Sequence, residues 1–259
     1  MRHDGGAPID ASGRLDVPAG WTTQRWTEVF TAQAGMFREA VGKADPAAKV
    51  PSCPGWTFTD LALHVGRFLE TSLEYLRTGS TVRLRLPSPP ADVAPLEYLD
   101  AQLAKAAELL PATPGNRTAW TFSPAAPDLA WVWHRRIAHE LNLRRWDAQA
   151  ALRELVVGDA DFAVDGIDEA LTTLLAAKYA ADVPPTAKGT ALVQLTDVPE
   201  AWVVTFQPGV VPEVRAAWPG EEADLLITGE AQLVHYGLWG RLPLKHTGDE
   251  QVWFALKLD

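Results

Sequence analysis

The chain has 259 residues, of which 47% are hydrophobic, so it is long enough to bury a core and to form two domains. Its formal net charge is −10, and the acidity is spread evenly: residues 1–185 hold 18 basic and 23 acidic side chains, and residues 186–259 hold 5 and 10. A chain without a basic region has no surface suited to neutralising phosphates, which argues against nucleic-acid binding.

The cysteine content and the chain start predict a cytoplasmic protein. Cys53 is the single cysteine, which excludes an internal disulfide framework and any CxxC metal or redox motif. Residues 1–20 lack an apolar segment of the kind found in secretory signals, and we expect them to be a disordered leader. No apolar run approaches the ~18 residues of a membrane span, so we expect no membrane partner.

The first part of the chain carries helical patterns separated by turns. Thr57 is predicted to cap the second helix, with Asp60 at its third position, and the four prolines within residues 84–95 predict a loop. Four or five antiparallel helices joined in this way describe a helical bundle, to which we assign residues 21–183. The predicted helices cover residues 21–41, 58–77, 96–110, 130–155 and 166–181.

After residue 187 the pattern changes to short runs of β-type residues separated by turns. We assign residues 188–259 to a small α+β domain, which is too short for a doubly wound sheet with a cofactor crevice. Predicted strands cover residues 191–196, 202–207, 210–216 and 224–228, and predicted helices cover residues 230–239 and 249–256.

The fourth predicted helix places a charged pair on its apolar face. Glu140 and Arg144 are four residues apart and project from the same side of the helix. A projection at 100° per residue puts Glu140 at the edge of the apolar arc and Arg144 near its centre. Burying a charge is costly unless it is paired or lines a wet pocket. The pair is therefore either a structural ion pair or part of a functional site, and the residues alone favour neither.

His64 borders the apolar arc of the second predicted helix and could point into the interior of the bundle. A half-buried histidine bonded to a neighbour is the commoner explanation. Cys53 lies in a turn before that helix, where a small buried residue is favoured over a nucleophile. Arg241 follows a glycine that ends a helix, and a charge that complements the helix dipole explains it. The chain has no P-loop, GxGxxG, GxSxG or EF-hand motif.

Three separated motifs resemble the mycothiol-dependent maleylpyruvate isomerase family. The first is the sequence Val-Pro-Ser-Cys-Pro-Gly-Trp-Thr at residues 50–57, which leads to Asp60-Leu61 and His64-Val65-Gly66. The second is His139-Glu140 with Arg-Trp-Asp-Ala at residues 145–148. The third runs through Asp224, Thr228-Gly229, Leu-Trp-Gly-Arg at residues 238–241 and Thr-Gly-Asp at residues 247–249.

The resemblance implies an α+β protein in which an N-terminal DinB-like four-helix bundle is followed by a small C-terminal α+β domain. It also implies mycothiol as a thiol cofactor, and a divalent metal, usually zinc, held by a histidine on the second helix and by a glutamate and a histidine four apart on a later helix. His64 and Glu140 match the first two ligands, but Arg144 stands at the third position. A guanidinium has no lone pair to offer, and two ligands do not make a stable zinc site.

Two outcomes follow for this site. In the favoured one, the metal is lost and the Arg144 guanidinium, paired with Glu140, takes its place and stabilises an anion. In the other, Arg144 swings aside and a further group or water completes a weak metal site. Arg241 resembles a family arginine that helps hold substrate carboxylates, so Arg144 and Arg241 are the predicted substrate-binding residues, in an interdomain cleft.

We therefore expect an enzyme that acts on a small organic or natural-product substrate carrying a carboxylate or another anionic group. Its reaction would be an isomerisation, a thiol S-transfer or a cyclisation, with His64, Glu140 and Arg144 as catalytic residues. The alternative is a non-catalytic small-molecule-binding module or sensor that kept the fold and lost the chemistry.

Overall fold

The computed structural model describes residues 17–18, 20–85, 93–181 and 185–258, which form two compact units. The first unit comprises residues 20–121 and 126–157, and the second is built mainly from residues 158–259. The predicted leader lies almost wholly outside the described residues, as does the middle of the predicted loop at residues 84–95. No helix in the described part of the chain is long and apolar enough to cross a membrane.

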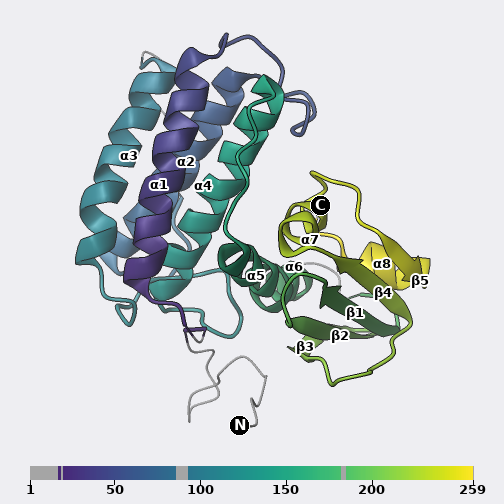
Figure 1. Cartoon of the computed structure of the whole chain (residues 1–259). Coiled ribbons are helices and arrows are strands. Elements are labelled where there is room, and N and C mark those ends of the chain that lie inside the picture. The colour runs from purple at the N-terminus through teal and green to yellow at the C-terminus, as the bar shows by residue number, and fades with distance from the viewer. Residues whose placement is uncertain (1–16, 19, 86–92, 182–184, 259) are drawn as a thin grey trace. The chain divides into compact units, whose positions relative to one another are not determined.

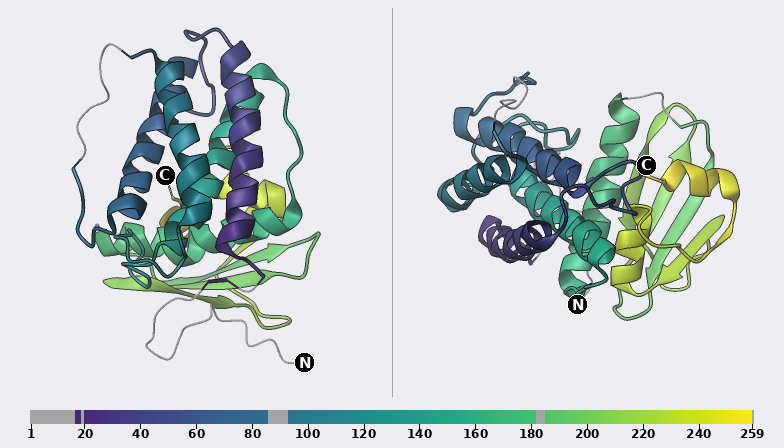
Figure 2. Two further views of the ribbon diagram at one scale, coloured as in Figure 1. Left: turned by 90° about the vertical axis from the view of Figure 1, so that its left-hand side faces the viewer. Right: turned by 90° about the horizontal axis from the view of Figure 1, so that it is seen from above.

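Four long helices form the first unit and lie side by side (Figures 1 and 2). Helix α1 packs mainly on α4, and α2 packs mainly on α3. This arrangement confirms the predicted four-helix bundle. The helices are α1 (Thr23–Lys43), α2 (Phe58–Thr78), α3 (Pro95–Ala112) and α4 (Trp131–Leu152).

Helix α2 begins where the sequence predicts. The Thr57 hydroxyl accepts a hydrogen bond from the backbone N–H of Asp60, and the Asp60 carboxylate accepts one from the backbone N–H of Thr57, which closes a capping box. The hydrogen bonds from Thr57 lower the pKa of Asp60. At the other end, Gly79 adopts a left-handed conformation that stops the helix.

Helix α4 packs against α1 and α2 and is buried on nearly all sides. Its tryptophans contribute to packing: Trp131 stacks on Trp26 of α1 with ring centroids 6.0 Å apart. The sequence extends this helix to residue 155, whereas it ends at Leu152 because Arg153 takes up a left-handed conformation with φ of 61°.

The second unit is a five-stranded mixed sheet with helices packed on it (Figure 1). The strand order is β3-β2-β1-β4-β5, in which β1 and β4 are parallel and the other neighbours are antiparallel. The strands are β1 (Gly189–Leu195), β2 (Ala201–Gln207), β3 (Val210–Ala216), β4 (Leu225–Gly229) and β5 (His246–Gly248), and the helices after β4 are α7 (Ala231–Leu238) and α8 (Glu250–Leu256).

The fifth predicted helix belongs to this second unit, which corrects its assignment to the bundle. The observed segment begins at Ala160, ahead of the predicted start at residue 166, and it runs through α5 (Ala160–Asp168), a π-helical turn η1 (Glu169–Leu174) and α6 (Leu175–Ala181). Its apolar residues share one core with the sheet, so the units divide at residue 158 and not near residue 183. Helical periodicity identifies a buried face but not the partner that buries it. The helix residues in this core are Ala163, Ile167, Ala170, Leu171 and Leu175.

The close approach of α2 and α3 depends on a residue without a side chain. A Cβ atom added at Gly66 would lie 2.6 Å from the Tyr98 ring, whereas a Cβ atom at Gly35 of α1 would have no such neighbour within 4 Å. We predict that Gly66→Ala lowers the free energy of unfolding by about 1–3 kcal/mol through overpacking. Gly35→Ala is the matched control and should be neutral or stabilising by up to about 1 kcal/mol. Urea denaturation measures both, and equal stability of the two variants would contradict this packing argument.

Candidate functional site

The structure brings His64, Glu140 and Arg144 together inside the bundle. His64 lies in the second turn of α2, and Glu140 and Arg144 lie one turn apart on α4. The Nε2 atom of His64 is 2.8 Å from Oε1 of Glu140, and the Nε atom of Arg144 donates to the same oxygen at 2.7 Å. One carboxylate oxygen therefore joins an imidazole from one helix to a guanidinium from another.

Glu140 is held in its ionised form. Burial raises the pKa of this carboxyl, but the charges of Arg144 and Arg136 and the hydrogen bond from His64 outweigh burial and hold its pKa well below the ordinary value. The Nη2 atom of Arg136 is 3.4 Å from the second oxygen of Glu140. The side chain is only 8% exposed, so Glu140 orients its neighbours and is a weak proton acceptor.

Arg144 is clamped on two sides. Its Nη1 atom donates to the buried carboxylate of Asp147 at 3.0 Å and contacts the sulfur of Cys53 at 3.5 Å. Burial lowers the pKa of Arg144, but the charges of Glu140 and Asp147 outweigh it and raise the pKa above the ordinary value. Within the described residues its Nη2 atom has no partner, so two N–H donors remain for another molecule.

An indole and a thiol complete the surroundings. The Trp56 ring lies 4.8 Å from the His64 ring and 5.4 Å from the Arg144 guanidinium, measured to the ring centroid. The thiol of Cys53 donates to Asp147 at 3.3 Å. The turn at residues 50–56 positions both, because Cys53 N–H donates to Val50 O and Trp56 N–H donates to Cys53 O.

His64 has the geometry of a general base. Its Nε2 atom faces an ionised carboxylate and therefore carries the proton, which leaves a lone pair on Nδ1 in the neutral ring. No residue in the described ranges bonds to Nδ1, and the side chain is 34% exposed. This nitrogen is therefore open to another molecule, and the guanidinium of Arg144 bonds to the same carboxylate oxygen as Nε2.

Comparison with known proteins finds a family profile to which the bundle is similar. Residues 27–149 match the profile of the mycothiol maleylpyruvate isomerase N-terminal domain. This match confirms the resemblance predicted from the sequence motifs.

Two solved structures are similar to most of this chain. One is the crystal structure of the mycothiol-dependent maleylpyruvate isomerase, with 11% identity, 88% of this chain and 95% of that chain covered, and a TM-score of 0.55. The other is a histidine-to-alanine mutant of that enzyme, with the same identity and coverage and a TM-score of 0.53. These matches confirm the fold. No match was found among curated proteins.

The metal implied by the isomerase family does not fit these residues. His64 and Glu140 face each other in a 2.8 Å hydrogen bond, and the third position holds the Arg144 guanidinium, which has no lone pair. Nowhere in the described residues do three His, Cys, Asp or Glu side chains gather as a metal-binding group. The assignment of His64 and Glu140 as metal ligands stays a prediction that this geometry does not favour.

Arg241 belongs to the second unit, where its Nη1 atom donates to the carbonyl of Trp239 at 2.7 Å. It follows Gly240, which has a φ of 68° and turns the chain after α7. Its role in holding substrate carboxylates, implied by the isomerase resemblance, stays a prediction.

Sequence reasoning misses several residues that shape this site. The sequence singles out Asp147 only as part of a family motif, and it does not single out Arg136 as a site residue. Asp147 lies seven residues after Glu140, and Arg136 lies four residues before it. Both therefore share the helix face of Glu140, so helical spacing could have identified them. Trp56 carries no such signal, because its contacts depend on how the turn before α2 folds back.

Ionised Glu140 should make stability depend on pH in a specific direction. Its pKa is lower in the folded than in the unfolded state, so its contribution is fully present above its ordinary pKa of 4.5 and is lost as the pH falls through the folded-state value. We predict that Glu140→Gln lowers the free energy of unfolding by about 3 kcal/mol at pH 7, and that this difference shrinks below about pH 4.5.

Chemical denaturation at a series of pH values measures this effect. Glu108→Gln is the matched control, because Glu108 is exposed and has no hydrogen-bond or ion-pair partner among the residues described; its effect should stay within about 0.5 kcal/mol at every pH. A Glu140→Gln difference that grows as the pH falls would contradict the electrostatic account of this carboxylate.

Replacing the guanidinium with a third metal ligand should change the metal affinity of the site. We predict that Arg144→His binds zinc at least about a hundredfold more tightly than the unaltered chain, because it completes a three-ligand set with His64 and Glu140. Competition with a chromophoric chelator measures the affinity, and the double variant Arg144→His/Glu140→Gln should lose the gain. Equal zinc affinity of the unaltered and Arg144→His proteins would contradict this assignment of positions.

Proposed function

We propose that the chain is a metal-independent acid–base enzyme that acts on a small organic anion by isomerisation, thiol S-transfer or cyclisation. The observation that carries this proposal is the shared oxygen of Glu140, which holds His64 and Arg144 in one constellation at 2.8 and 2.7 Å. His64 supplies a basic nitrogen, and Arg144 supplies fixed positive charge beside it. The family match supports an enzyme of this general kind.

The proton transfer that this arrangement favours runs between defined atoms. His64 Nδ1 accepts a proton from a carbon next to a carbonyl group, and the bonding electron pair moves onto the carbonyl oxygen to form an enolate. The N–H groups on Nη2 of Arg144 donate to that oxygen or to a neighbouring carboxylate. Where a C=C bond follows the deprotonated carbon, the enolate is a dienolate. The protonated imidazole then returns the proton to its γ-carbon, which shifts the double bond and completes an isomerisation without another reactant.

The remaining residues act on these two. Glu140 fixes the ring orientation and the tautomer of His64, and it stabilises the imidazolium that forms when His64 takes the proton. Asp147 keeps the Arg144 side chain in place through Nη1, so that Nη2 stays available. Trp56 packs beside both groups and excludes water from one side of the site. Between the two acid–base candidates predicted from the sequence, this geometry favours His64.

A low-molecular-weight thiol is compatible with the same constellation. The solved relative is named as mycothiol-dependent. If this chain uses mycothiol, His64 is the group placed to take the thiol proton, and the thiolate then adds to an electrophilic carbon of the substrate. Arg241 is the proposed second anchor for substrate carboxylates.

Exchange of carbon-bound hydrogen tests this proposal even while the product is unidentified. In D2O, we predict that the chain accelerates the exchange of the C3 hydrogens of 2-oxo acids such as pyruvate and 2-oxobutanoate, followed by proton NMR with and without mycothiol. His64→Gln should slow the enzyme-dependent exchange by about 10²–10⁴-fold, and Arg144→Gln by about 10²-fold or more.

His246→Gln is the matched control. His246 also pairs with a glutamate, at 3.4 Å from Glu250, but it lies in the second unit and contacts no guanidinium in the structure as described. This variant should leave the exchange unchanged. Stabilisation by these acids in a thermal shift assay without any exchange would contradict catalysis and favour a non-catalytic binding module.

A further inference from the structure

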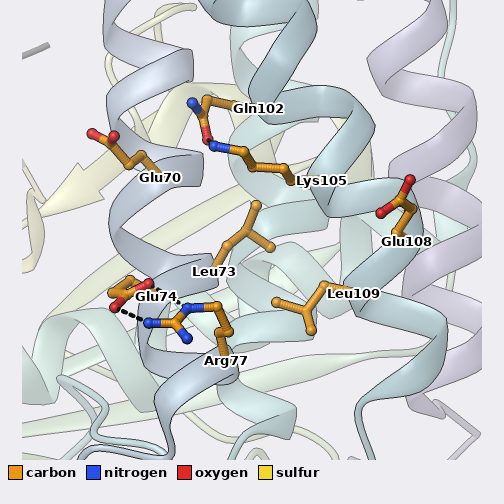
Figure 3. A pocket seen from close by; sticks show the side chains of 8 residues that line it. All are labelled: Glu70, Leu73, Glu74, Arg77, Gln102, Lys105, Glu108 and Leu109. Carbon is orange, nitrogen blue, oxygen red and sulfur yellow. Dashed lines mark hydrogen bonds and ion pairs between the residues drawn. The ribbon is translucent and has the colours of Figure 1, made fainter. Parts of the chain in front are cut away.

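A groove with a volume of about 430 Å³ lies between α2 and α3 (Figure 3). Four of its lining residues come from α2 and four from α3. Leu73 and Leu109 provide apolar surface, and the other six residues are polar or charged. None of the eight belongs to the His64–Glu140–Arg144 site, so this groove is a separate feature of the bundle.

Part of the charge in the groove is satisfied internally. Arg77 donates two hydrogen bonds to Glu74, from Nε at 2.8 Å and from Nη2 at 2.7 Å, and Figure 3 shows this pair at one end of the groove. This pair is therefore neutral as a unit. The charged groups that remain are the carboxylates of Glu70 and Glu108 and the ammonium of Lys105.

Gln102 is the residue that marks the groove as a built site. Its side chain lines the groove, yet the residue is only 4% exposed. The carbonyl oxygen of its amide accepts a long hydrogen bond of 3.4 Å from Lys105. Its amide nitrogen has no protein partner in the described part of the chain, so two N–H donors are left for a molecule in the groove that the residue lines. An acceptor bound there would pair with donors that no residue of the protein uses.

Glu70 also lines the groove, from α2, and has spare acceptor capacity. One of its oxygens accepts a hydrogen bond of 2.9 Å from the hydroxyl of Tyr98. Burial and this carboxylate raise the pKa of Tyr98, so the hydroxyl stays protonated and keeps donating. No other residue in the described ranges pairs with Glu70, which leaves its second oxygen available. Glu70 is therefore fixed in position and able to receive a cation.

We propose that this groove binds a free apolar α-amino acid in its zwitterionic form. The ligand ammonium pairs with the carboxylate of Glu70. The ligand carboxylate accepts hydrogen bonds from the amide nitrogen of Gln102 and from Lys105. The apolar side chain of the ligand packs on Leu73 and Leu109.

The balance of groups in the groove selects a zwitterion. A simple anion would satisfy Gln102 and Lys105 but would place its charge among unpaired carboxylates. A simple cation would pair with Glu70 but would leave the amide donors of Gln102 without an acceptor, and Lys105 would repel it. A molecule that carries both an ammonium and a carboxylate satisfies both sets. The cavity volume has room for such a molecule with an aliphatic side chain.

Isothermal titration of the full chain with L-leucine tests this proposal. Leucine should bind in the millimolar range or more tightly. The analogues 4-methylpentanoate, which lacks the ammonium, and 3-methylbutylamine, which lacks the carboxylate, should each bind at least about tenfold more weakly. Gln102→Met and Lys105→Met should each weaken leucine binding by about tenfold. Gln24→Met, which removes an exposed amide from α1, is the matched control and should leave binding unchanged.

Lys105 is exposed, so its variant keeps the test decisive if the Gln102 variant fails to fold. Three results would overturn the proposal: no binding of leucine at millimolar concentration, equal affinity for leucine and an analogue with one charge, or leucine affinity unchanged in Lys105→Met. Loss of leucine binding in Arg144→Gln alone would also overturn it, because the ligand would then occupy the other site. The outcome does not depend on the proposed function.

Discussion

The hydrogen bonds to Glu140 Oε1 are the contact on which the arrangement of the site depends. A single carboxylate oxygen accepts from His64 of α2 and from Arg144 of α4, so the position of each group is defined by the other. The carboxylate stays ionised in spite of burial because positive side chains surround it. Removing any member leaves a desolvated group without its partner, and this interdependence couples the packing of two helices to the chemistry that they carry.

A guanidinium and a metal ion both supply positive charge, but the chemistry of that charge differs. A divalent cation accepts lone pairs from substrate, whereas a guanidinium donates hydrogen bonds along fixed directions. In this chain the guanidinium is held by Glu140 and Asp147, which leaves one nitrogen for another molecule. A guanidinium held in this way is suited to planar anions and to developing negative charge, whereas activation of a bound water is the chemistry of a metal ion.

Much of this structure could be predicted from the sequence, and the exceptions share a cause. Periodicity identifies the helices and four of the strands, and residue type identifies the Thr57 cap. Helical spacing places Glu140 and Arg144 on one face. Periodicity does not show which element packs on the apolar face of a helix. Residues 160–181 are therefore assigned to the bundle, although their apolar side packs on the sheet. Strand β5 has three residues, too few to show alternation. The contacts of Cys53 and Trp56 depend on the folding of an irregular turn, which no periodic pattern describes.

The π-helical turn between α5 and α6 has a consequence for the evolution of this unit. Such a turn holds one residue more than an α-helical turn, and each residue of an α-helix rotates the chain by about 100°. Ile167 before the turn and Leu175 after it both reach the core of the sheet. Loss of a single residue from Glu169–Leu174 would convert the π-helical turn to an α-helical one and rotate the following residues about the helix axis. Ile167 and Leu175 would then no longer both face the core. The segment therefore tolerates substitution more readily than a change in length.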